Sequence, residues 1–216
     1  MPSDASVVAA RRALHAVAEH LLAGPQWRHA QEISLAVTAD GFATRFPPAP
    51  GVDALELAGT DVVARPSGAV VPLRGSVRSV AAGLGVTPGA PENLYREHAE
   101  LGPDDELAAD PEAVAVVLGA LTAGATALGE LARGTDETPI LWPEHFDVGI
   151  SVAEVNYGVS PGDGFSAEPY AYVGPWTPPA QDEFWDAPFG ATLVLAPGMA
   201  PEAVLAFFEE GRARLS

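Results

Sequence analysis

The residues best suited to chemistry gather in one segment, LWPEHFDVGISVAEVNYGVSPGDGFSAEPYAYVGPW, which runs from Leu141 to Trp176. His145 stands two residues before Asp147, and a carboxylate at that spacing can orient an imidazole as a general base. His145, Asp147 and Glu168 are therefore the candidate catalytic residues. The same three are weak candidates for a divalent metal site, because one nitrogen and two carboxylates can supply three ligands.

Aromatic residues accompany these acids. Residues 142–189 hold ten of the sixteen aromatic residues and eight acids, and no arginine or lysine lies between Arg133 and Arg212. Carboxylates beside aromatic faces suit a sugar or a cationic group, and the lack of arginine disfavours an anion. Tyr170, Tyr172 and Trp176 are therefore candidate binding residues for a small neutral or cationic ligand.

Two strands must position these side chains. Alternation in a strand over 146–152 places Val148 and Ile150 toward the core and four polar or small residues on the other face: His145, Asp147, Gly149 and Ser151. On the returning strand one face carries Glu168, Tyr170, Tyr172 and Gly174. If the two polar faces pair, the candidates converge above Gly149 and Ser151 and form an acidic, aromatic cleft.

The segment also matches G-x-S-x-G, from Gly158 to Gly162, but its surroundings contradict a nucleophile elbow. Pro161 follows Ser160 and has no N–H for an oxyanion, and no helix is indicated after it. No histidine follows His145, so the chain order serine, acid, histidine is impossible. The stretch Ser160-Pro-Gly-Asp instead predicts a type II turn.

Composition excludes several further classes of function. The formal net charge is −18, with 29 acids against 11 bases, and there is no lysine and no cysteine. Such a charge disfavours nucleic acid and anionic membranes. Without cysteine or lysine, thiol chemistry, Schiff bases and the P-loop lysine are excluded. No haem, iron–sulfur cluster, pyridoxal phosphate or P-loop nucleotide is expected, and the identity of any other cofactor stays open.

The elements indicate an α+β fold, a largely antiparallel sheet flanked by helices, which two similar fused halves could supply. Helices are predicted over 6–22, 76–84, 110–134 and 201–215. Gly24-Pro25 should end the first of these helices. Strands are predicted over 32–37, 41–46, 54–57, 61–64, 69–73 and 191–196. Residues 1–216 are expected to form one compact domain, with a possible subdivision into 1–86 and 110–216 through the Pro- and acid-rich connection 87–109.

The uncharged run from Ala113 to Gly129 lacks basic flanks, so it predicts a buried core helix rather than a membrane span. No basic n-region begins the chain, and a soluble, cytoplasmic protein is expected. The remaining histidines offer less chemistry. His15 and Glu19 have the i,i+4 spacing of a surface pair, and His20, His29 and His98 lack partners at metal-site spacing.

The box Trp142-Pro-Glu-His-Phe-Asp147, followed by Ser160-Pro-Gly-Asp163, Glu168-Pro-Tyr170 and Tyr172-Val-Gly-Pro-Trp176, resembles an uncharacterised, mostly actinobacterial protein family, a domain of unknown function. The resemblance is clearest over 141–189. It implies a bacterial cytoplasmic protein and transfers no activity. The family has a second histidine where Glu144 stands here, a difference that weakens a two-histidine metal site.

Two hypotheses follow for function. The first is a small-molecule or metal-binding domain that uses the 142–189 segment, with catalysis left open. The alternative is a non-catalytic structural or oligomerisation module in which the aromatic residues form core and interface, and the chain forms a homo-oligomer.

Overall fold

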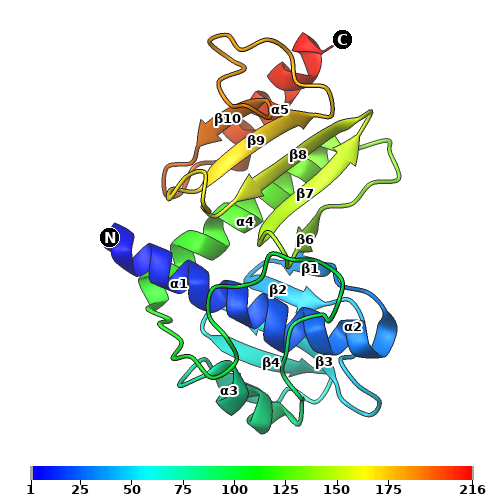
Figure 1. Cartoon of the computed structure of the whole chain (residues 1–216), viewed down its shortest axis with the longest axis vertical. Helices are drawn as coiled ribbons and strands as arrows, with labels where there is room; N and C mark the ends of the chain where they lie inside the picture. The colour runs from blue at the N-terminus through cyan, green and yellow to red at the C-terminus, as the bar shows by residue number, and fades with distance from the viewer. Residues whose placement is uncertain (1, 216) are drawn as a thin grey trace. The chain divides into compact units, whose positions relative to one another are not determined.

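A computed structural model describes residues 2–215 and has the predicted α+β fold with a largely antiparallel sheet flanked by helices (Figure 1). The chain forms two compact units. Unit 1 comprises Met1–Leu118 and Leu141–Phe146, and unit 2 comprises Gly119–Ile140 and Asp147–Ser216. Each unit combines antiparallel strands with helices. Their origin as similar fused halves stays a prediction.

Unit 1 begins with a helical rod of three consecutive segments: α1 (Asp4–Ala16), the π-helix η1 (Val17–Ala23) and α2 (Gly24–Ala30). The predicted stop at Gly24-Pro25 is wrong, because the rod passes through it in right-handed helical conformation. Pro25 has no N–H, yet it is tolerated because it stands in the first turn of α2. All seven residues of η1 are buried.

A loop residue satisfies the backbone where proline interrupts the rod. The Gly89 N–H donates to the His20 carbonyl at 2.9 Å. Gly24 allows this approach, because a Cβ added there would lie only 1.7 Å from the Gly89 carbonyl oxygen. The loop and the rod are therefore built against one another.

The sheet of unit 1 has the strand order β6-β1-β2-β3-β4-β5. Its strands are β1 (Leu35–Thr38), β2 (Gly41–Thr44), β3 (Ala54–Ala58), β4 (Asp61–Arg65), β5 (Val70–Pro72) and β6 (Ile140–Trp142). The strands predicted over 32–37 and 41–46, and those over 54–57 and 61–64, form antiparallel hairpins with tight turns between Thr38 and Gly41 and between Ala58 and Asp61. The η1 segment of the rod packs on β1 and β2, and the rod buries apolar residues that include Leu14, Leu21 and Leu22.

The helix α3 (Val77–Leu84) begins with a capping box formed by Ser76 and Ser79, close to its predicted limits. Residues 87–109, which the sequence presents as a possible connection, lie within unit 1. Besides Gly89, Leu107 binds unit 1 through its backbone N–H, which donates to the Gly75 carbonyl at 2.7 Å. The segment is thus fixed to the fold at several points.

Unit 2 has the strand order β10-β9-β8-β7. Its strands are β7 (Asp147–Val152), β8 (Val155–Ser160), β9 (Tyr170–Pro175) and β10 (Ala191–Val194). Strand β8 was not predicted from the sequence, and it begins directly after the turn at Ala153 and Glu154. In Figure 1 the helices α4 (Pro111–Leu131) and α5 (Pro201–Arg214) cover one face of this sheet, so its other face carries no helix.

The long helix α4 begins as predicted, because the Asp110 carboxylate accepts the Ala113 N–H at 3.0 Å. Its length and composition alone would allow it to cross a membrane. In unit 2 it packs instead on the sheet, with Gly124 against Val148 and Val159. The predicted core helix is thus confirmed for this face.

Two glycines of α4 give a matched test of this packing. A Cβ at Gly124 would lie 2.7 Å from the Val159 Cβ, whereas one at Gly119 meets nothing within 4 Å. Gly124→Ala is expected to lower the free energy of unfolding by about 1–3 kcal/mol through overpacking. Gly119→Ala should raise it by up to about 1 kcal/mol through helix propensity. Urea denaturation measures both, and equal effects would contradict the packing.

Candidate functional site

The candidate site lies on the face of the unit 2 sheet that carries no helix. Strand register places Gly149 opposite Gly158, and Gly158 opposite Tyr172. Because side chains alternate along a strand, Asp147, which lies two residues before Gly149, points to the same face. Alternation in the sequence thus placed Asp147, Tyr170 and Tyr172 on the correct common face. The predicted pairing joined β7 directly to β9, however, whereas β8 lies between them.

Tyr172 crosses strand β8 to reach Asp147. Its hydroxyl donates to the Asp147 carboxylate at 2.5 Å. The ring passes over Gly158, where an added Cβ would lie 2.3 Å from the hydroxyl oxygen. Burial, and then the Asp147 charge, raise the pKa of Tyr172 well above its ordinary value. The hydroxyl therefore stays protonated and serves as a hydrogen-bond donor.

A second tyrosine–carboxylate pair lies beside the first. The Tyr170 hydroxyl donates to Asp163 at 2.6 Å, and burial with this hydrogen bond raises the Tyr170 pKa. Asp163 also accepts hydrogen bonds from the Ser160 hydroxyl at 3.0 Å and from the backbone N–H groups of Phe165 and Ser166. Four donors occupy this carboxylate, so its role is to hold the loop that follows β8.

The serine motif has a structural role in the same loop. Ser160 is 2% exposed, and its hydroxyl accepts the Gly162 N–H at 3.2 Å. Gly162 has the positive φ, 104°, that the predicted type II turn requires. The Asp163 N–H, however, donates to the Ser166 carbonyl rather than closing the turn on the Ser160 carbonyl. No nucleophile elbow is formed, since β8 is followed by a loop rather than a helix.

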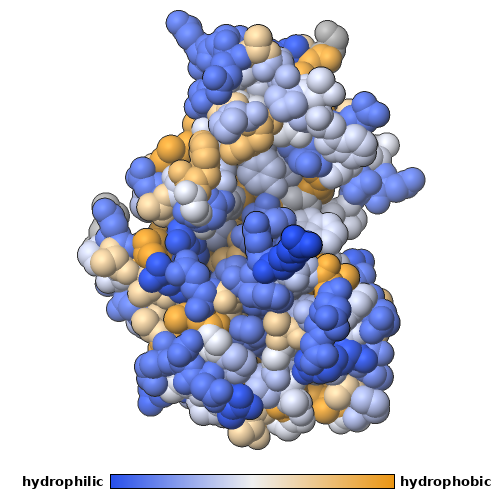
Figure 2. Space-filling view, viewed as in Figure 1, coloured by the Kyte–Doolittle hydropathy of each residue, from blue (hydrophilic) through white to orange (hydrophobic). Residues whose placement is uncertain are grey.

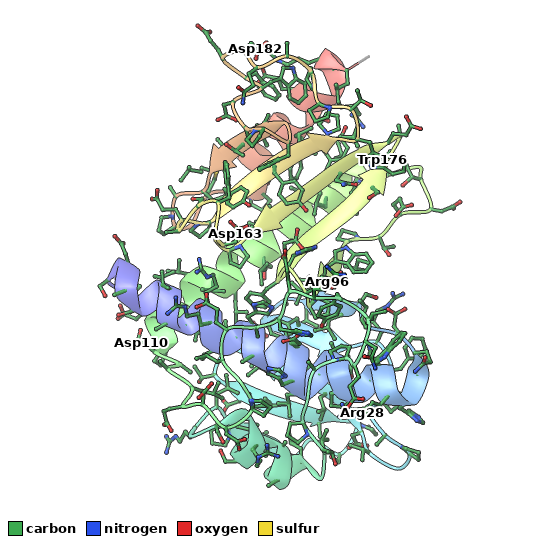
Figure 3. The ribbon with its side chains drawn as sticks, viewed as in Figure 1. Arg28, Arg96, Asp110, Asp163, Trp176 and Asp182 are labelled. Carbon is green, nitrogen blue, oxygen red and sulfur yellow. The ribbon has the colours of Figure 1, made fainter. Side chains whose placement is uncertain are left out.

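Trp176 is a fixed aromatic residue on the surface of unit 2, at the end of β9. Its side chain is 65% exposed, yet its indole N–H donates to Asn156 at 3.2 Å and its backbone N–H to Glu154 at 2.9 Å. Ala153 and Glu154, in the adjoining β7–β8 turn, both have positive φ. Figure 3 shows Trp176 and Asp163 at opposite ends of this sheet.

Two predicted site residues lie elsewhere. Glu168 is exposed in the loop before β9 rather than on that strand. His145 belongs to a turn of unit 1. Phe146, with φ 53°, separates it from Asp147, although the two residues were predicted to share one face of a strand. The exposed His145 Nδ1 lies 3.7 Å from Glu97. The structure therefore does not assemble His145, Asp147 and Glu168 into one group.

The Trp-Pro-Glu-His-Phe-Asp box contributes packing to unit 1. The Phe146 ring stacks on His15 with centroids 5.3 Å apart, and it meets Phe42 edge-on at 5.8 Å. His15 Nε2 donates to the Pro143 carbonyl at 2.7 Å. The box is thus held by the first helix, and His15 does not form the surface pair that its spacing to Glu19 predicted.

Metal binding by three acids or histidines finds no support in the part of the chain that the structure describes. Among residues 2–215, no three His, Asp or Glu side chains are grouped as such a site requires. His145, Asp147 and Glu168, the weak metal candidates, likewise do not form such a group within residues 2–215.

Sequence reasoning missed a buried polar cluster on the π-helix. Glu19 is fully buried, and its carboxylate accepts hydrogen bonds from His98 Nδ1 at 2.6 Å and from the Ala99 N–H at 2.8 Å. His20 is 6% exposed, and its Nε2 donates to the Leu101 carbonyl at 3.1 Å. The only sequence signal was an acid and histidines beside apolar positions of an amphipathic helix.

Two histidines of unit 1, His15 and His20, should make this unit sensitive to acid. Burial lowers the pKa values of His15 and His20 below their ordinary value of 6.5. The unfolded chain therefore takes up protons first, so their contribution to stability is complete above pH 6.5 and falls as the pH decreases below it. We expect a lower urea midpoint for unit 1 at pH 5.5 than at pH 7.5. His15→Asn should reduce this difference, whereas the exposed His29→Asn should leave it unchanged.

Comparison with protein-family models, curated proteins and solved structures gives no match to this chain.

Proposed function

We propose that the protein is a ligand-binding domain, and that the helix-free face of unit 2 binds a small molecule through a cationic ammonium or guanidinium group. Trp176 supplies the aromatic surface and the exposed Glu154 of the adjoining turn supplies the charge. Tyr170 and Tyr172 lie on the same face, where their hydroxyls bind Asp163 and Asp147. A bacterial cytoplasmic setting, which the family resemblance implies, belongs to the same proposal.

The observation that carries the proposal is the state of Trp176. Large aromatic side chains usually bury most of their surface, but Trp176 is 65% exposed while one hydrogen bond holds its indole N–H and another holds its backbone N–H. A fixed and exposed indole loses little conformational entropy when a ligand covers it. Its face attracts a cation through the ring quadrupole.

Charge favours the same class of ligand. The region from 134 to 211 contains no arginine or lysine, and Glu154, whose carbonyl binds Trp176, is exposed. Phe165, 52% accessible beside Tyr170 and Phe189, is a second exposed aromatic residue, but it lies with Asp163 at the other end of the sheet from Trp176 (Figure 3). An anion would meet only like charge here, whereas a cation gains both aromatic and carboxylate contacts.

The test compares two ligands of nearly equal shape. Isothermal titration of the full chain with choline and with its uncharged isostere 3,3-dimethylbutan-1-ol separates charge from size. We expect saturable binding of choline and at least about tenfold weaker binding of the alcohol. Trp176→Ala should weaken choline binding about tenfold, and Phe46→Ala, which removes an exposed phenylalanine of unit 1, should leave it unchanged. Equal affinities for both ligands, or no effect of Trp176→Ala, would contradict the proposal.

The oligomerisation alternative is favoured by the edge of the unit 2 sheet. Strand β10 is the last in the order, and Val194 on it is 50% exposed. An apolar edge strand can pair with a second copy of the chain. Under this alternative, sedimentation velocity shows a concentration-dependent dimer that Val194→Lys abolishes, and choline does not bind.

A further inference from the structure

The π-helical turn of unit 1 places an acid in the core. Glu19 is fully buried within η1, whose seven residues are all buried. Single π-helical turns inside α-helices occur frequently at functional sites. A buried carboxylate also carries a large desolvation penalty unless its partners are well placed. A neutral residue could join the loop to the helix without that penalty, so the buried charge points to a function beyond holding the loop.

The partners of Glu19 fix the tautomer of a histidine on the surface. His98 Nδ1 lies 2.6 Å from Glu19 Oε1, so Nδ1 carries the proton and donates it, which leaves the Nε2 lone pair free. The His98 side chain is 43% exposed. Within residues 2–215, Nε2 neither forms a hydrogen bond nor ranks among the buried polar atoms that lack one. It therefore faces solvent.

Neighbouring groups support a negative charge at Glu19. The Tyr95 ring lies 5.1 Å from the His98 ring between centroids. Burial, and then the charge of Glu19, raise the Tyr95 pKa, so this hydroxyl stays neutral. The Ala99 N–H binds the second oxygen of Glu19 at 2.8 Å. The carboxylate is thus held on both oxygens and can stabilise a positive charge on His98.

A second observation is an unsatisfied nitrogen beside the pair. His20 lies 3.6 Å from Glu19 Oε2 through Nε2, which also donates to Leu101. Its Nδ1 is buried and has no hydrogen-bond partner in the described part of the chain, although His20 is only 6% exposed. Buried polar atoms of this kind are rare, and functional sites are among their explanations.

We propose that His98 and Glu19 form a proton-accepting site in unit 1, with His98 Nε2 as the base for a hydroxyl-bearing ligand or a water molecule. In this step the ligand O–H proton moves to Nε2. The Nδ1 proton stays hydrogen-bonded to Glu19, whose charge stabilises the imidazolium. Glu19 is the positioning residue. The exposed Glu97 and Glu100 on the same loop favour a neutral or cationic ligand over an anion.

The test measures the reactivity of Nε2 with diethyl pyrocarbonate. Nε2 attacks one carbonyl carbon and the Nδ1 proton is lost, so the products are N-carbethoxyhistidine, carbon dioxide and ethanol. Mass spectrometry of tryptic peptides gives the rate at each histidine. The exposed His29 and His145 are controls within the same chain. We expect His98 to react at least about tenfold faster than either control, because the carboxylate orients it and receives the departing proton.

Glu19→Gln separates this role from simple exposure. The variant should slow His98 about tenfold while the rates at the exposed His29 and His145 stay unchanged. Nitrogen-15 shifts of the wild-type chain provide a second readout that needs no variant, with Nδ1 protonated and Nε2 unprotonated in the neutral His98 ring. A His98 rate equal to that of His29, or the opposite tautomer, would overturn the proposal. Choline binding at Trp176 tests unit 2 separately.

Discussion

Gln26→Ala is expected to lower the free energy of unfolding by about 3–5 kcal/mol, because this buried side chain satisfies four backbone groups. Its Oε1 accepts the N–H groups of Arg45 and Phe46 at 2.6 and 2.9 Å. Its Nε2 donates to the carbonyls of Glu32 and Ser34 at 2.8 and 3.1 Å. Alanine leaves these four groups without their partner at a position where the side chain itself is fully buried.

Urea denaturation and amide hydrogen exchange measure this effect. The Arg45 and Phe46 amides should lose protection in Gln26→Ala, while amides in the centre of β7 and β8 stay protected. Gln181→Ala is the matched control, because Gln181 is exposed and its removal should change stability by less than about 0.5 kcal/mol. Similar effects of the two substitutions would show that Gln26 does not link α2 to the sheet.

Glu19→Ala is expected to destabilise unit 1 by about 2–3 kcal/mol. It removes the acceptor for His98 Nδ1 and for the Ala99 N–H. Breaking a fully buried pair often costs about 3–5 kcal/mol, but His98 is partly exposed and water replaces some of the lost interaction. The segment 87–109 should detach more often as a result.

Trypsin reports this detachment at one bond, because Arg96 lies within the segment and the chain has no lysine. Cleavage after Arg96 should be faster in Glu19→Ala than in the wild type. Glu92→Ala removes an exposed acid of the same segment that does not adjoin the cleaved bond, and it should leave both cleavage and stability nearly unchanged. Unaltered cleavage in Glu19→Ala would mean that the carboxylate does not hold the loop.

Local signals in the sequence were sufficient for much of the fold. The Ala39-Asp40 and Gly59-Thr60 turns lie between runs of alternating apolar residues, and Asp110-Pro111 marks the start of α4. These features act over a few residues, so the pattern alone specifies them. The rod was different. Its passage through Gly24-Pro25 depends on Gly89, which lies far along the chain.

The candidate site was predicted in part. Alternation correctly placed Asp147, Tyr170 and Tyr172 on one face, but β8 was missed because Val155–Ser160 contains an asparagine, a tyrosine and a glycine that blur its pattern. Gly158 then allows Tyr172 to cross that strand. The sequence could not separate His145 from Asp147, since nothing local indicates the positive φ of Phe146, whose ring packs on the distant His15 and Phe42.

Burial of charged residues was the least predictable feature. Glu19 looks like an ordinary surface acid in the sequence, because its i,i+4 partner His15 suggests a helical ion pair. The π-helical turn shifts the register and brings both Glu19 and His20 into the interior. Figure 2 shows the contrasting pattern, with strongly hydrophilic side chains spread over much of the visible surface.

The most direct test of the account follows the Trp176 indole N–H resonance of the full chain during titration with choline. A saturable shift of this resonance is expected, with the other three indole resonances nearly unchanged and a much smaller response to 3,3-dimethylbutan-1-ol. An unmoved Trp176 resonance at saturating choline, or equal shifts with the two compounds, would contradict a cation-binding face on unit 2.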